Sequence, residues 1–210
     1  MKISVIIPAY NEERYIEACI QSISSQRKSE IIVVCDSCTD KTKEIAKKYT
    51  RKVYSVRLRN VSAVRNYGAA QASGEILVFI DADSVMAPHL LDEINNAITT
   101  GYIGGVTKTI SSENILKADI MWHVGNFFRH FFYAGSGLIF CRADAFTGYD
   151  ETRKLAEDTH VLLALKKKGR LKYITNSYIK TSSRRLEKEG YLRTIYKQFS
   201  AFFIRNKKGY

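Results

Sequence analysis

The sequence has few features that separate or export parts of a chain. Its 210 residues include only two prolines, and we find no internal repeat and no low-complexity tract. Long linkers are usually rich in such residues, so we expect one domain, alone or with an appendage. No apolar stretch approaches the roughly 18 residues that a membrane span needs. The N-terminal residues Met1-Lys2-Ile3-Ser4 run straight into an apolar segment instead of a signal peptide, which predicts a cytoplasmic protein.

Cysteine is also scarce. The sequence contains Cys19, Cys35, Cys38 and Cys141, and without an export signal we expect reduced thiols. Cys35 and Cys38 have the spacing of a redox pair or of half a zinc site, but the other two cysteines supply no matching second pair. We favour the interpretation that two small residues flank a functional aspartate, Asp36.

Acidic residues are nearly missing from the C-terminal part. Residues 166–210 contain 14 Lys and Arg against 2 Asp and Glu, whereas residues 1–165 contain 19 of each. This part therefore carries the whole net charge of +12, which predicts contact with a membrane surface, a nucleic acid or a phosphorylated substrate. The alternative is a solvated helix that only keeps the protein soluble.

The same C-terminal part has an amphipathic pattern. From about Glu187, apolar side chains share one helical stripe, namely Tyr191, Leu192, Ile195, Tyr196, Phe199, Phe202 and Phe203. An apolar stripe with cationic flanks is typical of a helix that lies in the plane of an anionic membrane. Docking on the protein's own core, or on a second subunit of a homodimer, is the alternative.

Apolar runs and helical patterns alternate four times in the first 100 residues. We expect strands at 3–7, 31–34, 53–56 and 76–80, with helices between them and another after Pro88. We expect Asn11 to cap the first of these helices. Such a series predicts an α/β fold with a Rossmann-like, mostly parallel central sheet and helices on both faces. Residues 103–106, 137–141 and 178–180 add further strands, and residues 107–136 have no clear pattern.

Charged residues follow the predicted strands where ligands bind in open α/β sheets. Asp36 ends the second strand, and Asp81-Ala82-Asp83 ends the fourth. Two carboxylates one residue apart suit Mg²⁺ or Mn²⁺ held jointly with phosphates, although a solvated acidic turn has the same composition. Arg65, in the preceding helix, either balances phosphate charge or pairs with an aspartate.

Several segments together resemble family 2 glycosyltransferases, which have the GT-A fold. The resemblance covers about residues 3–170 and is carried, in the family's order, by Ser4–Glu12, Val33–Asp40, Arg65–Ala70, Phe79–Asp83, Gly148–Glu151 and Glu157-Asp158. It implies an inverting transfer of a sugar from a nucleotide diphosphate sugar to an acceptor hydroxyl. The cofactor would be Mn²⁺ or Mg²⁺.

The resemblance also implies roles for individual residues. Asp36 would contact the base, Asp81 the ribose or the metal, and Asp83 the metal that bridges the diphosphate. Asp158 would be the general base, although an acidic pair with Glu157 in the first turn of a helix has a structural explanation as well. The donor, a UDP- or GDP-sugar, would be bound by Pro8, Ala9, Tyr10, Glu12, Asp36, Arg65, Asp81 and Ala82.

Further residues are candidates for the diphosphate or the acceptor. Arg184 and Arg185 would reach a diphosphate of the donor or of a lipid-linked acceptor, unless they form a cationic surface turn. Trp122 would stack on a sugar or lipid, unless it belongs to the core. Glu157 is a candidate for the same region. The Gln-x-x-Arg-Trp motif of processive cellulose- or chitin-type synthases is missing from the sequence. The resemblance therefore implies transfer of one sugar per encounter.

These features combine into one functional hypothesis. Residues 1–180 form the GT-A domain, with a nucleotide-binding half at 1–100 and an acceptor-binding half at 101–180, and residues 181–210 form the basic appendage. The protein would act on a lipid-linked or other membrane-proximal acceptor in glycan or cell-envelope biosynthesis, peripherally on the cytoplasmic face of the membrane.

Two other functions fit parts of the pattern less well. A sugar-phosphate nucleotidyltransferase would need a glycine-rich loop after the first strand, where Pro8-Ala9-Tyr10-Asn11 contains no glycine. Nucleic-acid binding through the basic tail lacks any recognisable module, so no nucleic-acid partner is expected.

Overall fold

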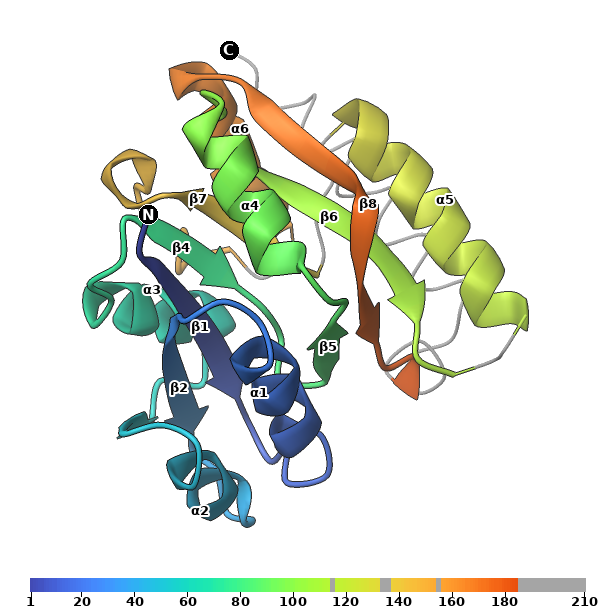
Figure 1. Ribbon diagram of the computed structural model, residues 1–210. Coiled ribbons are helices and arrows are strands. Elements are labelled where there is room, and N and C mark those ends of the chain that lie inside the picture. The colour runs from blue at the N-terminus through green and yellow to red at the C-terminus, as the bar shows by residue number, and fades with distance from the viewer. Residues whose placement is uncertain (114–115, 133–136, 154–155, 185–210) are drawn as a thin grey trace.

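The computed structural model of the protein describes residues 1–113, 116–132, 137–153 and 156–184 (Figure 1). In these ranges an α/β fold is built on one sheet with the order β3-β2-β1-β4-β7-β6-β8-β5. The strands are β1 Ile3–Ala9, β2 Glu30–Asp36, β3 Lys52–Val56, β4 Ile76–Phe79, β5 Ser84–Met86, β6 Gly104–Ser111, β7 Ile139–Arg142 and β8 Leu171–Thr181. The helices are α1 Ile16–Ser24, α2 Thr42–Lys47, α3 Val61–Ala70, α4 Leu90–Thr99, α5 Leu116–Phe132 and α6 Glu157–Lys168.

The first half of the sheet is parallel, as the alternation of apolar runs and helices predicts. Strand β1 lies between β2 and β4 and pairs in parallel with both, so that Val5 is opposite Ile31 on one side and Val78 on the other. Strand β3 continues this arrangement in parallel with β2. The carboxyl ends of these strands therefore meet at one edge of the sheet.

The second half of the sheet is mixed. Strand β7 runs antiparallel to both β4 and β6, whereas β6 and β8 are parallel and the short β5 is antiparallel to β8. The mostly parallel sheet expected from the sequence thus holds for strands β1 to β4 and becomes mixed beyond β4. The antiparallel pairing of β5 with β8 places Thr181, at the end of β8, opposite Ser84. Since β5 directly follows residues 81–83, the end of β8 lies next to the segment that follows β4.

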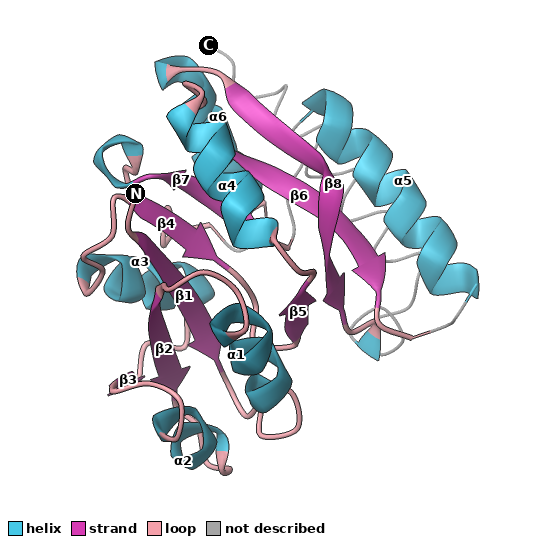
Figure 2. Ribbon diagram, in the orientation of Figure 1, coloured by secondary structure: helices cyan, strands magenta, loops and turns pink. Residues whose placement is uncertain are grey.

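Helices cover both faces of the sheet (Figure 2). Neighbouring residues of β1 point to opposite sides, since side chains alternate along a strand. Val5 and Ile7 join the apolar side chains of α1 and α4 on one face, whereas Ile6 packs with α6 on the other. Full burial of each such side chain contributes roughly 1.5–3 kcal/mol, so both layers hold the sheet in place.

Helix α3 lies unusually close to β1. A Cβ atom added at Gly68 would lie only 2.4 Å from Cγ2 of Ile6. Glycine at this position lets the helix axis approach the strand, and no other residue fits without movement of the helix or the strand. This contact fixes the height of α3 over the sheet, and with it the position of Arg65.

Some sequence-based expectations need correction. Residues 107–136, which have no clear pattern, contain the end of β6 and the helix α5. Strand β8 is longer than the predicted 178–180 and begins at Leu171. Helix α1 begins at Ile16 after Tyr15, so Asn11 is not its cap; Asn11 has a φ of 54° and binds the neighbouring loop instead.

Helix α5 was missed because apolar residues occur on its exposed side, such as Ile120 and Phe127, as well as on its buried side, such as Ala118. It packs against β6, where the side chain of Asn126 accepts a hydrogen bond from the N–H of Thr109 and donates one to its carbonyl oxygen, at 3.0 and 2.7 Å. The amide thus replaces a neighbouring strand at this part of β6.

The predicted amphipathic C-terminal helix and Arg185 lie outside the described residues. Within the part of the chain that the structure describes, none of the helices combines the length and the apolar character needed to span a bilayer.

Candidate active site

The carboxyl edge of the parallel strands gathers most of the predicted site residues. Strand β1 leads into the loop Tyr10–Tyr15, β2 ends at Asp36, and β4 leads to Asp81 and Asp83. Arg65 reaches this edge from α3, and Asp158 from the start of α6.

The loop after β1 is fixed by the loop after β2. Backbone N–H groups of Glu12 and Glu13 donate to Thr42 Oγ1 at 2.7 Å and to Asp40 Oδ2 at 3.0 Å. Asn11 Oδ1 accepts from the N–H of Thr39 at 2.8 Å. Of the predicted donor-binding residues here, Ala9 is buried, Pro8 is partly buried, and Tyr10 is 64% exposed. The tyrosine ring is therefore accessible to a ligand.

Asp36 is buried at the end of β2. Its Oδ1 accepts hydrogen bonds from the N–H of Leu58 at 2.8 Å and from Ser37 Oγ at 3.2 Å. These bonds fix the direction in which the carboxylate presents Oδ2. The neighbouring Cys38 donates from its thiol to the carbonyl oxygen of Ala9 at 3.3 Å, and all four cysteines are free thiols. Cys35 and Cys38 thus flank this aspartate in the chain, and the thiol of Cys38 links the segment after β2 to the end of β1.

Arg65 is the centre of the site. Its side chain is buried, and Nη2 lies 2.9 Å from Asp81 Oδ1 while Nη1 lies 3.1 Å from Asp158 Oδ1. Nη1 is also 3.5 Å from Glu157 Oε1. Burial disfavours its charge, but Asp158 and Asp81 outweigh that effect and raise the pKa of Arg65. One guanidinium thus connects the acids after β4 with those that begin α6, which is the pairing alternative of the sequence analysis.

Asp158 is an unusual carboxyl group. Burial raises its pKa to about 7, because the charged form loses its hydration, and Arg65 opposes this rise only in part. The neighbouring negative charges of Glu157 and Asp81 raise the pKa further. A carboxyl group with a pKa near neutrality exchanges a proton readily at physiological pH, which general bases require.

The loop before α6 supports Asp158 from the opposite side. The ring of Tyr149 lies against Arg65, with the guanidinium carbon 5.2 Å from the ring centre. Asn66, the residue after Arg65, accepts from the N–H of Tyr149 at 2.7 Å and donates to its carbonyl oxygen at 2.9 Å. The motif Gly148–Glu151 is therefore fastened to the helix that carries Arg65.

Asp83 faces a second arginine. Arg184 Nη2 lies 3.3 Å from Asp83 Oδ2 and also donates to Glu12 Oε1. Burial, with the nearby Asp81, raises the pKa of Asp83 to about 6 although Arg184 lowers it. Burial also raises the pKa of Glu12, and Arg184 opposes that shift too. Arg184 therefore belongs to an ion-pair cluster and does not form a mere surface turn.

The donor atoms of this cluster suit a hard divalent cation. Asp81, Asp83 and Glu12 offer carboxylate oxygens, and Oε2 of Glu12 is buried without a hydrogen-bond partner among the described residues. Within these residues no group of three or more acidic, histidine or cysteine side chains is arranged as a complete metal cage. Mg²⁺ and Mn²⁺ commonly bind one or two carboxylates together with substrate phosphates, so the residues fit such an ion.

The segment that carries Arg184 is held by a residue that the sequence did not reveal. Glu113 accepts hydrogen bonds from the N–H of Ser183 at 2.8 Å and from Ser182 Oγ at 3.0 Å. The N–H of Ser182 also donates to the carbonyl oxygen of Asp83 at 3.3 Å. No local pattern could have identified Glu113, because its partners are about 70 positions away.

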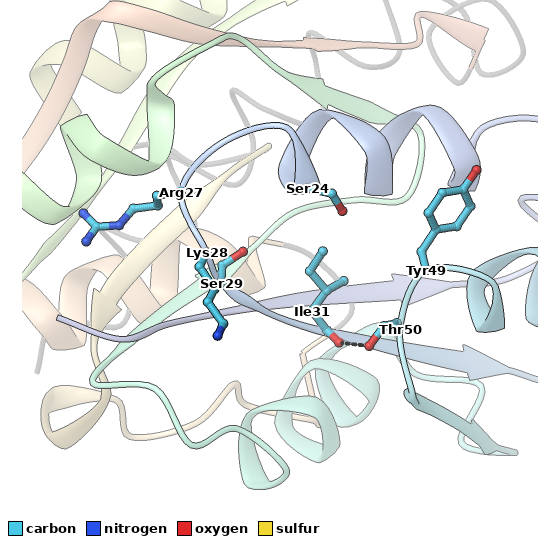
Figure 3. A pocket seen from close by; sticks show the side chains of 7 residues that line it. All are labelled: Ser24, Arg27, Lys28, Ser29, Ile31, Tyr49 and Thr50. Carbon is cyan, nitrogen blue, oxygen red and sulfur yellow. Dashed lines mark hydrogen bonds between the residues drawn. The ribbon is translucent and has the colours of Figure 1, made fainter.

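Two predicted residues are not placed at the site by these contacts. Trp122 is a partly buried residue of α5, which packs against β6, and Arg185 lies outside the described residues. A cavity of about 230 Å³ lies elsewhere, near the start of β2, and is lined by Ser24, Arg27, Lys28, Ser29, Ile31, Tyr49 and Thr50 (Figure 3). It is at the opposite end of β2 from Asp36, so it is separate from the acid cluster.

Comparison with known proteins identifies similar sequences and structures. Residues 4–152 match the model of the family described as Glycosyl transferase family 2. An uncharacterised glycosyltransferase of Nostoc sp. is 36% identical over 115 residues, which are 50% of this chain and 35% of that protein. The chain thus spans about a third of the length of this relative.

Two solved structures share the fold. The crystal structure of Staphylococcus aureus TarS 1–349 has a TM-score of 0.67 and 23% identity, covering 87% of this chain and 61% of that one. Glucosyl-3-phosphoglycerate synthase from Mycobacterium tuberculosis, in complex with Mn²⁺, UDP and glucosyl-3-phosphoglycerate, has a TM-score of 0.68 and 22% identity, covering 90% and 75%.

Proposed function

Because the chain belongs to glycosyl transferase family 2, we propose that it transfers a single sugar from a nucleotide diphosphate sugar to an acceptor hydroxyl. The observation that carries this proposal is the buried Arg65, which contacts both Asp81 and Asp158. Arg65 thereby holds Asp81, which is proposed to bind the sugar donor, close to Asp158, the proposed base with a pKa of about 7. A base and a nucleotide-sugar site next to each other are what direct transfer requires.

The donor would bind along the strand ends. In this proposal Asp36 accepts a hydrogen bond from the base of a UDP- or GDP-sugar, and Asp81 one from the ribose. Pro8, Ala9, Tyr10 and Ala82 are the other residues assigned to the donor, and Tyr10, with its exposed ring, is the most accessible of them. The UDP complex of the mycobacterial synthase supports a uridine donor by analogy of fold.

The departing diphosphate needs positive charge. We assign Asp83, with help from Asp81, to hold Mn²⁺ or Mg²⁺, which when bound would act as a Lewis acid on the leaving group. Arg184 would add a second positive group of the protein itself, since it already contacts Asp83 and Glu12. Burial of these carboxylates keeps their interactions with cations strong.

Asp158 would remove the acceptor's proton. Its carboxylate takes the proton as the acceptor oxygen attacks the anomeric carbon, and attack from the face opposite the diphosphate inverts that centre. The sugar ring then carries positive charge in an oxocarbenium-like transition state. Arg65 orients Asp158 and keeps a fraction of it ionised near neutral pH, because its charge favours the carboxylate.

The acceptor is proposed to be lipid-linked or another glycan near a membrane, in glycan or cell-envelope biosynthesis. Helix α5 supports this, because Ile120, Val124 and Phe127 are exposed large apolar side chains spaced by four and three residues. The strongly basic residues 166–210 would add attraction to an anionic cytoplasmic leaflet. Flotation with anionic but not with neutral liposomes is expected, and equal flotation with both would contradict an electrostatic contribution.

The decisive experiment measures donor binding and turnover together. We expect UDP- or GDP-sugars to raise the thermal midpoint in the presence of Mn²⁺, because a ligand of the native state stabilises it. We also expect the enzyme to release nucleoside diphosphate when acceptor is supplied. Release of pyrophosphate from a nucleoside triphosphate and a sugar phosphate would instead show a nucleotidyltransferase and refute the proposal.

A further inference from the structure

Arg184 occupies the place where the acid cluster would bind a cation. Its Nη2 contacts Glu12 Oε1 and lies 3.3 Å from Asp83 Oδ2, so one nitrogen serves both carboxylates. The Arg184 side chain is 40% exposed, whereas those of Glu12 and Asp83 are 15% and 17% exposed. The acids are therefore built into the protein, and the cation that neutralises them reaches in from its surface.

The acids need a positive partner in every state of the site. Glu12 and Asp83 lie close enough to share one guanidinium nitrogen, and two carboxylates this close repel each other unless a cation lies between them. The loop after β1 cannot move away to relieve this repulsion, because Thr42 and Asp40 bind the N–H groups of Glu12 and Glu13. When a cation leaves the cluster, another cation or a proton on one of the carboxylates must therefore take over its charge.

Arg184 satisfies the cluster only in part. The two carboxylates share a single guanidinium nitrogen, whereas the strongest arginine–carboxylate pairs use two parallel hydrogen bonds. The second oxygen of Glu12, Oε2, remains buried without a hydrogen-bond partner among the described residues. A small divalent ion would neutralise more charge at shorter distances than the guanidinium does.

The side chain of Arg184 can leave while its backbone stays in place. The preceding residues are fixed, since Glu113 binds Ser182 and Ser183, and Thr181 Oγ1 accepts from Ser84 Oγ at 2.8 Å. The guanidinium stacks over the ring of Tyr15, with its carbon 4.5 Å from the ring centre. Rotation about side-chain bonds is enough to take its charge from the carboxylates to a ligand above them.

We propose that Arg184 is an internal counter-cation that a divalent metal ion displaces from Glu12 and Asp83, and that the released guanidinium then binds the donor's diphosphate. The proposal rests on the metal site assigned under the proposed function. It makes a specific prediction: Arg184 opposes metal binding in the absence of a nucleotide and favours nucleotide binding once the metal is present.

The test compares Mn²⁺ binding, followed by electron paramagnetic resonance of the free ion, in the full chain and in Arg184→Gln. Without nucleotide, the variant should bind Mn²⁺ roughly twofold to fivefold more tightly, the range expected for loss of a partly exposed competing ion pair. With saturating Mn²⁺, the same variant should bind UDP several-fold more weakly. Arg153→Gln is the matched control, because Arg153 is a similarly exposed arginine that pairs with Asp150, and both affinities should stay unchanged.

The outcomes separate this inference from the proposed function. Unchanged or weaker Mn²⁺ binding by Arg184→Gln, in a variant that melts cooperatively, overturns the exchange. Asp83→Asn tests the metal site itself: undiminished Mn²⁺ binding by that variant refutes the assigned metal ligand, and with it the exchange. If Asp83→Asn loses Mn²⁺ and Arg184→Gln gains no affinity, the metal site stands and only the exchange is wrong.

Discussion

Arg65 and Asp158 are 93 positions apart in the sequence, and Nη1 of Arg65 donates to Oδ1 of Asp158 at 3.1 Å in the interior of the protein. Both side chains are less than a tenth exposed. The same guanidinium holds Asp81, so any change at one of these acids alters the electrostatic field at the other. The predictions below follow largely from this connection.

The first prediction concerns Asp158 as the general base. Replacement Asp158→Asn should reduce sugar transfer by about 10²- to 10⁴-fold, because an amide cannot accept the acceptor's proton. Binding of UDP, measured by calorimetry, should remain close to that of the wild type. Transfer at the wild-type rate would show that another group takes the proton.

A second prediction follows from the pKa of Asp158, which is about 7. The active form is the carboxylate, so the transfer rate should rise as pH increases through about 7 and level off above it. A pH–rate profile in wild type measures this limb directly. A rate that is flat between pH 5.5 and 8.5 would exclude a titrating base in this range.

The third prediction concerns Arg65. Its charge lowers the pKa of Asp158, so Arg65→Gln should move the ascending limb of the profile to higher pH. Removing one partner of a buried ion pair also costs about 3–5 kcal/mol of unfolding free energy, which urea denaturation would measure. The variant Arg65→Lys keeps the charge, so the pH of its ascending limb should return most of the way to the wild-type value. This variant should still be less stable than wild type. A limb at the same pH in all three proteins would mean that Arg65 does not control Asp158.

A fourth prediction concerns Asp83. Replacement Asp83→Ala should abolish Mn²⁺-dependent turnover of the donor, because the carboxylate proposed to hold the ion is lost. The control is Asp144→Ala, which removes a well-exposed aspartate paired with Arg142 and should leave turnover unchanged. Initial rates across a series of Mn²⁺ concentrations give the comparison. Equal Mn²⁺ dependence in Asp83→Ala and wild type would contradict the assignment.

The last prediction tests the packing that places Arg65. A Cβ in Gly68→Ala would meet Cγ2 of Ile6 at 2.4 Å, so α3 must move away from β1. We expect a loss of about 1–3 kcal/mol in unfolding free energy, the usual cost of overpacking a core, with reduced transfer by the folded protein. Ser62→Ala on the same helix adds no volume and should leave the position of α3 unchanged. Full activity with unchanged stability in Gly68→Ala would show that the helix position is not critical.

The strands and the acids at their ends could be predicted because their signals are local. Apolar runs such as Ile76–Ile80 identify a buried strand, and Asp81 and Asp83 follow it directly in the chain. Parallel topology then places them at the same edge of the sheet as Asp36 without further information. Helix α5 was missed for the opposite reason, since apolar side chains also lie on its exposed side and its contact with β6 involves the polar Asn126.

The roles of the two arginines could not be predicted from nearby residues, because their contact partners are distant in the sequence. Arg65 was identified, but the choice between phosphate binding and ion pairing depends on α6, which begins more than 90 residues later. Arg184 was left between a ligand contact and a surface turn, and only the structure shows that it pairs with Glu12 and Asp83. Glu113 carries no sequence signal at all, because an isolated glutamate becomes significant only beside Ser182 and Ser183.

The sequence by itself determined the alternation of strands and helices, the family and the positions of the acids, because each depends on residues close together in the chain. Only the tertiary structure decided which charges neutralise one another. That choice depends on distance and burial: strand pairings that no neighbouring residues encode bring an arginine from α3 to Asp81 and another, after β8, to Asp83.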